Sequence, residues 1–223
     1  MTTTLPAPLP PATATGLVAT PDPADVAAAA RDAVKTYGAG DAAVHALAGV
    51  SVDFERGRFT AIMGPSGSGK STLMQNVAGL DTLTSGTVSI GGVDLSSLSD
   101  RQLTRLRRDR IGFIFQSFNL VPTLTAKENI ELPLDLAGRA PDRAWFDEIV
   151  ATVGLGSRLG HRPAELSGGQ QQRVAVARAL ASKPEIVFGD EPTGNLDSRS
   201  GGEVLAFLRQ LPDRPAPWSS GVG

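Results

Sequence analysis

The chain has 223 residues, a net charge of −2 and no cysteine. This length allows one domain with a sizeable core, the charge argues against a global basic surface for nucleic acid or anionic lipid, and the missing cysteines exclude disulfides and thiolate metal sites. His45 and His161 are too far apart in sequence to argue for a transition-metal site. No apolar run approaches the roughly 18–20 residues of a membrane span, and the first residues do not resemble a signal peptide. We therefore expect a cytosolic protein.

The N-terminal part of the chain divides into a tail and a strand region. Residues 1–24 are rich in Thr, Pro and Ala and predict a disordered tail. Residues around 33–60 predict strands of an antiparallel edge subdomain. Val50–Phe54 alternates apolar and polar residues, as does Val88–Ile90, and Gly91–Gly92 is typical of a turn.

A glycine-rich segment follows the first strands and fits the pattern G-x-x-x-x-G-K-[ST] without mismatch. A short apolar run, Phe59–Met63, predicts a buried parallel strand before it, and Ser71–Gly79 predicts a helix after it. The alternative is a Gly/Ser turn with an incidental lysine, but strand, loop and helix together favour a phosphate site. The candidate phosphate-binding residues are Gly64, Ser66, Gly67, Ser68, Gly69, Lys70, Ser71 and Thr72.

The middle of the chain predicts a charged segment, a strand and a mostly helical insert. Arg101–Arg110 carries five arginines, and a charge run of this kind is usually a solvated face. Ile111–Phe115 predicts an apolar strand. Glu128–Ile130 is expected on one helix of the insert, and Pro141-Asp142 is expected to open the next.

Two further segments carry candidate chemistry. Leu166–Arg173 places a serine and two glycines before an apolar, helix-forming run, which favours an anion-binding helix start over an ordinary polar loop. Ile186–Glu191 is a short apolar run that ends in two carboxylates. A strand ending there would put Asp190 beside the phosphate loop as a Mg²⁺ ligand, with Glu191 deprotonating the attacking water. The alternative is an acidic turn.

With these motifs, the chain resembles the nucleotide-binding subunits of ABC transporters, and most closely the branch with the macrolide-exporter and lipoprotein-releasing ATPases. The resemblance runs from about Ala33 to Asp213 and rests on Leu166–Arg173, Phe115–Pro122 and Asp190–Asp197. It implies an α/β P-loop NTPase core, in which helices flank a parallel sheet, within a domain over residues 25–213. It also implies an antiparallel β subdomain and a helical subdomain, residues 117–183, that contains the glutamine loop and the signature segment, Leu166–Arg173.

The resemblance also implies roles for single residues. Tyr37 matches the aromatic residue that stacks on adenine, although an edge-strand aromatic is the alternative. Gln116 matches the glutamine that contacts Mg²⁺ and the water, with a plain polar residue at a strand end as the alternative. Ser167 and Gly169 match groups that touch the γ-phosphate on an opposite subunit. Asp197 matches a residue of the loop that crosses the dimer interface, or it caps a helix.

The implied cofactors and partners follow from these roles. The cofactors are ATP and Mg²⁺, with Ser71, Gln116 and Asp190 as metal ligands and with Glu191 and Gln116 as catalytic residues. The resemblance implies a head-to-tail homodimer with ATP between its subunits. It also implies an integral membrane permease that holds the protein at the inner face of the membrane, and it implies export as the direction of transport. The lack of a global basic excess argues against a nucleic-acid partner.

The C-terminal residues 214–223 do not resemble the family. The family has there a central strand and a histidine that contacts the γ-phosphate. In this chain, Pro212–Pro217 contains three prolines, and proline has no backbone N–H to donate to a neighbouring strand, so a central strand is not expected. We expect the sheet to be split between the phosphate-loop strand and the Asp190 strand, with weak folding and little hydrolysis. A frameshift or premature stop after about Asp213 is one hypothesis. A degenerate ATP-binding module is the alternative function, and a soluble ABC protein acting on nucleic acid is disfavoured by the charge.

Overall fold

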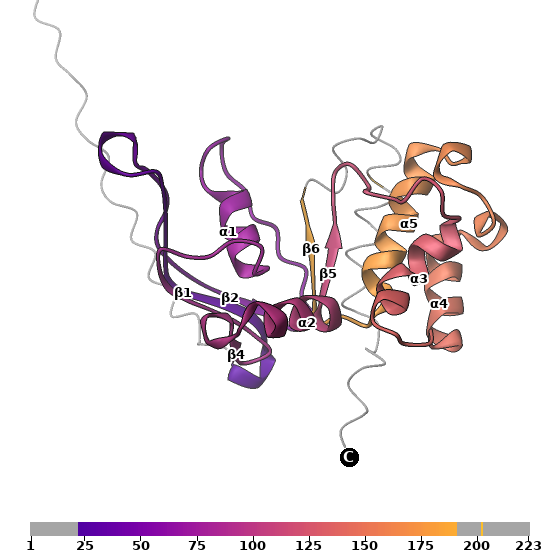
Figure 1. The fold of residues 1–223 in the computed structure, drawn as a ribbon, viewed down its shortest axis with the longest axis horizontal. Helices are drawn as coiled ribbons and strands as arrows, with labels where there is room; N and C mark the ends of the chain where they lie inside the picture. Colours follow the sequence, from indigo (N-terminus) through magenta and orange to yellow (C-terminus); the bar gives the residue numbers. More distant parts are fainter. Residues whose placement is uncertain (1–21, 191–201, 203–223) are drawn as a thin grey trace, which may run out of the picture.

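The computed structural model describes residues 22–190 and Gly202 (Figure 1). The expected catalytic carboxylate Glu191, the interface residue Asp197 and residues 214–223 therefore lie outside the described residues. Of the expected N-terminal tail, Pro23–Asp25 forms a 3-10 turn that leads into the first strand.

An antiparallel sheet forms the first layer of the protein, as expected. Its strands are β1 (Val26–Tyr37), β2 (Val44–Glu55), β3 (Ser85–Ile90) and β4 (Val93–Asp94). They lie side by side in the order β2-β1-β3-β4. The sheet begins earlier than the expected residue 33. The reason is the run Ala27–Ala30, whose weak strand propensity gives no sequence signal but whose small side chains are buried by the neighbouring strands.

Five α-helices lie in the described part of the chain. They are α1 (Lys70–Val77), α2 (Asp100–Arg110), α3 (Ala126–Leu136), α4 (Arg143–Val153) and α5 (Gly168–Ala181). Short 3-10 turns occur at Gly40–Ala42, Leu95–Ser97, Gly156–Arg158 and Pro163–Glu165. Side chains that accept bonds from first-turn N–H groups fix three helix starts, at Thr125, Asp142 and Ser167. Within residues 22–190, no helix has the length and apolar character needed to cross a bilayer.

A parallel pair of strands lies between the antiparallel sheet and the helices α3, α4 and α5 (Figure 1). β5, Ile111–Ile114, pairs with β6, Ile186–Gly189, and Ile111 lies opposite Ile186. Both strands were expected from their apolar runs. Their carboxyl ends point to the same side of the molecule as the loop before α1, which is the upper side in Figure 1.

The expected strand at Phe59–Met63 is wrong. This segment has no regular structure, and Phe59, Ile62 and Met63 are 44%, 40% and 88% exposed. Within the described residues it pairs with no strand. An extended run persists as a strand only when its N–H and C=O groups find ladder partners and its side chains are covered. The parallel sheet in the described residues therefore has two strands, β5 and β6.

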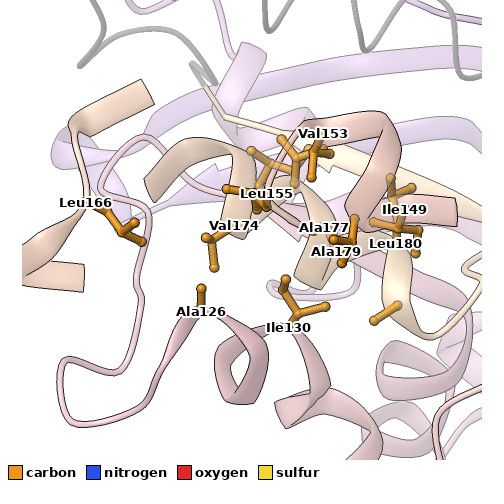
Figure 2. Packing of buried hydrophobic residues seen from close by; sticks show 14 of the residues in the cluster. Ala126, Ile130, Ile149, Val153, Leu155, Leu166, Val174, Ala177, Ala179 and Leu180 are labelled. Carbon is orange, nitrogen blue, oxygen red and sulfur yellow. The ribbon is translucent and has the colours of Figure 1, made fainter. Parts of the chain in front are cut away.

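Two apolar clusters meet at this parallel pair. One lies among α3, α4, α5 and β5 (Figure 2), and the other joins the antiparallel sheet, α1 and α2 to the opposite side chains of β5 and β6. The helix α5 approaches β5 closely at Gly112, where a Cβ atom would lie 2.4 Å from the carbonyl oxygen of Ala179. The position of β5 is thus fixed from both sides, and with it the residues that follow β5.

Candidate functional site

The glycine-rich loop before α1 bends through two left-handed residues. Gly67 has φ +79° and Gly69 has φ +85°, a region that glycine adopts readily and other residues do not. A Cβ atom on Gly69 would lie 2.4 Å from the carbonyl oxygen of Ala46 on β2, whereas a Cβ atom on Gly67 would meet nothing within 4 Å. The second glycine is therefore required for the loop to pack on the sheet.

Lys70, the first residue of α1, turns back into this loop. Its Nζ donates to the carbonyl oxygens of Pro65 and Gly64 at 2.7 and 3.0 Å. An ammonium group is thus held at the start of a helix, where the unpaired N–H groups and the helix dipole favour a bound anion. The loop, the lysine and the helix start together make a site suited to phosphate.

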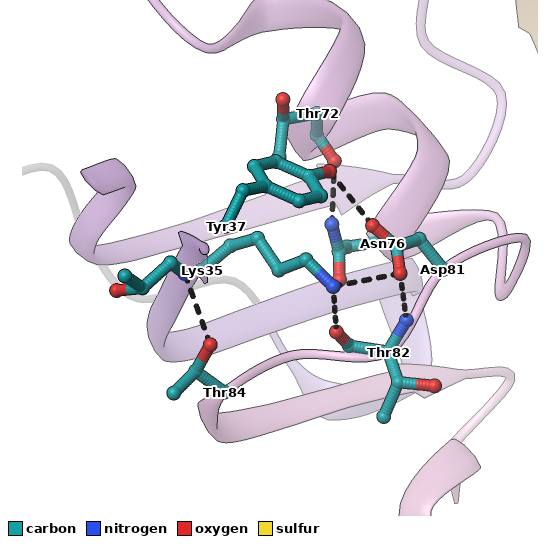
Figure 3. A network of polar contacts seen from close by, with 8 residues as sticks. Lys35, Tyr37, Thr72, Asn76, Asp81, Thr82 and Thr84 are labelled. Atoms are coloured by element: carbon teal, nitrogen blue, oxygen red, sulfur yellow. Dashed lines mark hydrogen bonds and ion pairs between the residues drawn. The ribbon is translucent and has the colours of Figure 1, made fainter. Parts of the chain in front are cut away.

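Tyr37 lies next to α1 in a network of polar contacts (Figure 3). Its Oη donates to Oδ2 of Asp81 at 2.8 Å, and Lys35 donates from Nζ to Oδ1 of the same carboxylate at 2.7 Å. The Lys35 ammonium also lies 4.8 Å from the centre of the Tyr37 ring, and Thr72 of α1 contacts the phenol. The ring is 41% exposed, so a half-exposed aromatic side chain stands beside the phosphate loop.

Lys35 and Asp81 were missed in the sequence, because neither belongs to a motif. The Lys35 ammonium, which donates to the Asp81 carboxylate, holds the pKa of that carboxyl below its ordinary value. The carboxylate in turn raises the pKa of Tyr37 by accepting its hydrogen bond and by repelling a phenolate. Strand β1 and the turn after α1 are tied together through this tyrosine.

The chain has one tyrosine, so any change in phenolate absorbance with pH reports the ionisation of Tyr37 alone. We expect the phenolate absorbance of the folded protein to appear at a pKa above 10.0. In Asp81→Asn it should appear at a lower pH, because the negative charge that opposes ionisation is gone. Asp53→Asn, which removes an ion-paired aspartate elsewhere on the sheet, is the control. A titration unchanged in Asp81→Asn, with folding verified by circular dichroism, contradicts the assignment.

Oxygen-bearing side chains lie at the start of α1 and just after the ends of β5 and β6. Ser71 is exposed in the first turn of α1, and Gln116 is exposed just after β5. Asp190 follows β6, and its N–H donates to the carbonyl oxygen of Ile114 at 3.0 Å, which places it beside the end of β5. Hydroxyl, amide and carboxylate oxygens are the ligands that Mg²⁺ takes, so the chemistry of these residues fits that ion.

The signature segment begins α5. Ser167 Oγ accepts from the N–H of Gln170 at 3.3 Å, and Gln170 Oε1 accepts from the N–H of Ser167 at 2.9 Å, a reciprocal cap at a helix start. The helices α5 and α1 lie on opposite sides of β5 and β6 (Figure 1). The structure therefore does not bring Ser167 and Gly169 to the phosphate loop of the same chain.

Known proteins resemble this chain in both sequence and structure. Residues 47–194 match the family model of the ABC transporter domain. The chain is 52% identical over 182 residues to an uncharacterized ABC transporter ATP-binding protein of Thermotoga maritima, covering 81% of this chain and 78% of that protein. It is 50% identical over 183 residues to the macrolide export ATP-binding/permease protein MacB of Marinobacter nauticus, covering 81% of this chain. The match covers only 28% of the MacB protein.

Solved structures agree with the sequence comparisons. The dimeric structure of MJ0796, a bacterial ABC transporter cassette, superposes with a TM-score of 0.73 at 44% identity and covers 83% of each chain. A dimeric structure of the same cassette in a post-hydrolysis state, bound to ADP and Pi, gives the same TM-score at 43% identity. The fold is thus that of an ATP-binding cassette.

Proposed function

This chain belongs to the ABC transporter family, and from that membership we propose that it binds MgATP and is the ATP-hydrolysing subunit of a transporter. The observation that carries the proposal is the Lys70 ammonium held in the glycine loop at the start of α1. A compact positive charge among backbone donors suits the β- and γ-phosphates.

The remaining site residues have the following roles in this proposal. Tyr37 stacks on adenine beside the loop, and the loop residues from Gly64 to Thr72 hold the phosphates. Mg²⁺, when bound, neutralises charge on the phosphates, and Ser71, Gln116 and Asp190 are its proposed ligands. Glu191, which directly follows Asp190 in sequence, is the proposed base for the attacking water.

The proposed assembly is a head-to-tail dimer. Supporting it, α5 lies across β5 and β6 from α1, so Ser167 and Gly169 would complete the nucleotide site of a partner, and the similar MJ0796 cassette is dimeric. We propose further that the dimer works on an integral membrane permease at the inner face of the membrane. The name of the MacB relative, an export ATP-binding/permease protein, supports an exporter.

The domain boundaries belong to the same proposal. We assign residues 25–213 to the ATP-binding domain and residues 117–183 to its helical subdomain. The helices α3, α4 and α5 share one apolar cluster, which supports treating them as a unit.

A second candidate, a degenerate module that binds ATP but hydrolyses little, has one observation in its favour. The segment before the phosphate loop, Phe59–Met63, is exposed and pairs with no strand in the described residues. A phosphate loop without a strand beneath it is held less firmly, and weak positioning lowers catalysis more than it lowers binding.

Phosphate release under steady-state conditions separates the two candidates. We expect the protein to release phosphate from ATP, and Glu191→Gln to lower that rate by roughly 100-fold or more, since a positioned base contributes about 10²–10⁴-fold. ATP binding by Glu191→Gln should be retained. Bound ATP with no turnover in the unsubstituted protein would favour the degenerate module, and no ATP binding at all would contradict both candidates.

A further inference from the structure

One arginine of α5 holds the loop that follows Gln116. Arg178 donates from Nη2 to the carbonyl oxygen of Phe118 at 2.7 Å and from Nη1 to that of Asn119 at 2.5 Å. Phe118 and Asn119 both have left-handed backbones, with φ values of 57° and 50°. Two consecutive non-glycine residues in this region are unfavourable, so the conformation needs support from outside the loop, and the guanidinium gives it.

The bonds from Arg178 are strong ones. Its surroundings lower its pKa through burial, but a guanidinium keeps its proton at every physiological pH. Arg178 is partly buried, and its bond to Phe118 is more enclosed than its bond to Asn119, which is exposed. A charged donor makes stronger hydrogen bonds than a neutral donor. The loop carbonyls are therefore tied firmly to α5.

The other end of the same loop is fixed as well. Asn129 of α3 is fully buried; its Oδ1 accepts from the N–H of Val121 at 2.8 Å, and its Nδ2 donates to the carbonyl oxygens of Val121 and Leu124. The backbone from residue 118 to residue 124 thus belongs rigidly to the helical layer.

Gln116 lies in the short stretch between two fixed points. Ile114 is held in the parallel pair opposite Gly189, and Phe118 is held by Arg178. Only residues 115–117 connect them, so the place of the Gln116 side chain depends on where Arg178 holds the following backbone.

We propose that Arg178 is a positioning residue that sets the orientation of Gln116 toward the metal and phosphates of bound MgATP. This inference rests on the proposed function, because it uses the role of Gln116 as a metal ligand. Both hydrogen bonds that Arg178 makes within residues 22–190 go to backbone carbonyl oxygens, so it acts through the loop.

The test is a double-mutant cycle on the gain in ATP affinity that Mg²⁺ gives, measured as the ratio of dissociation constants without and with Mg²⁺. We expect Arg178→Met to lower this ratio about fivefold and Gln116→Ala to lower it similarly, with little further loss in the double variant, because coupled residues are non-additive. The affinity for ATP without Mg²⁺, which depends on the phosphate loop, should stay unchanged in all three variants.

Arg173 provides a matched control on the same helix. Its guanidinium donates to the carbonyl oxygen of Val153 at 3.1 Å, on α4 and away from the Gln116 loop, so Arg173→Met should leave the ratio unchanged. Arg178→Lys keeps the charge and one donor, and we expect it to restore part of the ratio. This variant also keeps the test usable if Arg178→Met fails to fold.

A second readout needs no nucleotide. The chain has no cysteine, so Ser117→Cys gives a single thiol for a nitroxide label, whose mobility should rise in Arg178→Met and not in Arg173→Met. Two results would overturn the inference and leave the proposed function standing. One is that Arg178→Met changes neither the mobility of the label nor the ratio of dissociation constants. The other is that Arg178→Met lowers this ratio equally in the presence and in the absence of the Gln116 side chain. Failure of the unsubstituted protein to bind ATP overturns both.

Discussion

Replacing Gly69 by alanine is expected to lower the free energy of unfolding by about 3 kcal/mol or more and to weaken ATP binding at least about tenfold. The left-handed backbone of Gly69, φ +85°, costs an alanine about 1–2 kcal/mol. The larger part comes from the 2.4 Å approach of the new Cβ to the carbonyl oxygen of Ala46. That oxygen belongs to β2 and is backbone, so it has no rotamer into which it can move away.

Gly67→Ala separates the two causes of this loss. Gly67 has nearly the same φ, +79°, but an added Cβ meets nothing within 4 Å. Gly67→Ala should therefore lower the free energy of unfolding only by the cost of the left-handed backbone, about 1–2 kcal/mol. It should also keep more of its ATP affinity than Gly69→Ala. Both variants are measured by urea unfolding and by competition with a fluorescent ATP analogue. Equal losses would show that the contact with Ala46 does not shape the loop.

The local parts of the site could be predicted from the sequence because their signals are local. The spacing of Gly64, Gly69 and Lys70 specifies the loop. A serine and two glycines before an apolar run predicted the helix start at Leu166–Arg173, where α5 begins. Strands were predicted from the apolar runs at Ile111–Phe115 and Ile186–Glu191. The structure has them as Ile111–Ile114 and Ile186–Gly189, paired with each other. In each case the residues that carry the sequence signal lie within a few positions of one another, although the pairing of the two strands joins distant segments.

The failures concern contacts that depend on distant residues. Phe59–Met63 has the composition of a buried strand, yet a strand exists only beside a partner, and the described residues provide none. Asp81 lies 46 positions from Lys35, and Arg178 lies 60 positions from Phe118. Such pairs carry no signal in one sequence, so the network at Tyr37 and the support of the Gln116 loop appear only in three dimensions.

Replacing Asn129 by leucine is expected to destabilise the protein by about 3 kcal/mol, although leucine has the same branching and the same number of side-chain heavy atoms and suits a helix interior better. The Asn129 side chain is fully buried and serves the N–H of Val121 and the carbonyl oxygens of Val121 and Leu124. Without it, the N–H of Val121 and the carbonyl oxygen of Leu124 lose this partner, at about 1–3 kcal/mol for each unsatisfied group, whereas the Val121 carbonyl oxygen still accepts from the N–H of Leu124. The loop after Gln116 would also lose one of its two attachments.

Asn76→Leu is the matched comparison, and it should act in the opposite direction. Asn76 of α1 is also buried, at 2% exposure, but among the described residues its Nδ2 bonds only to the carbonyl oxygen of Thr72 in its own helix, and its Oδ1 finds no partner there. Leucine there removes an unsatisfied acceptor and leaves no backbone group without a bond, so we expect a gain of about 1 kcal/mol. Thermal unfolding of the two variants, side by side, checks both signs. The same substitution thus distinguishes a buried amide that holds a loop in place from one that only fills space in the core. If Asn129→Leu and Asn76→Leu lost equal amounts of stability, that distinction would be refuted.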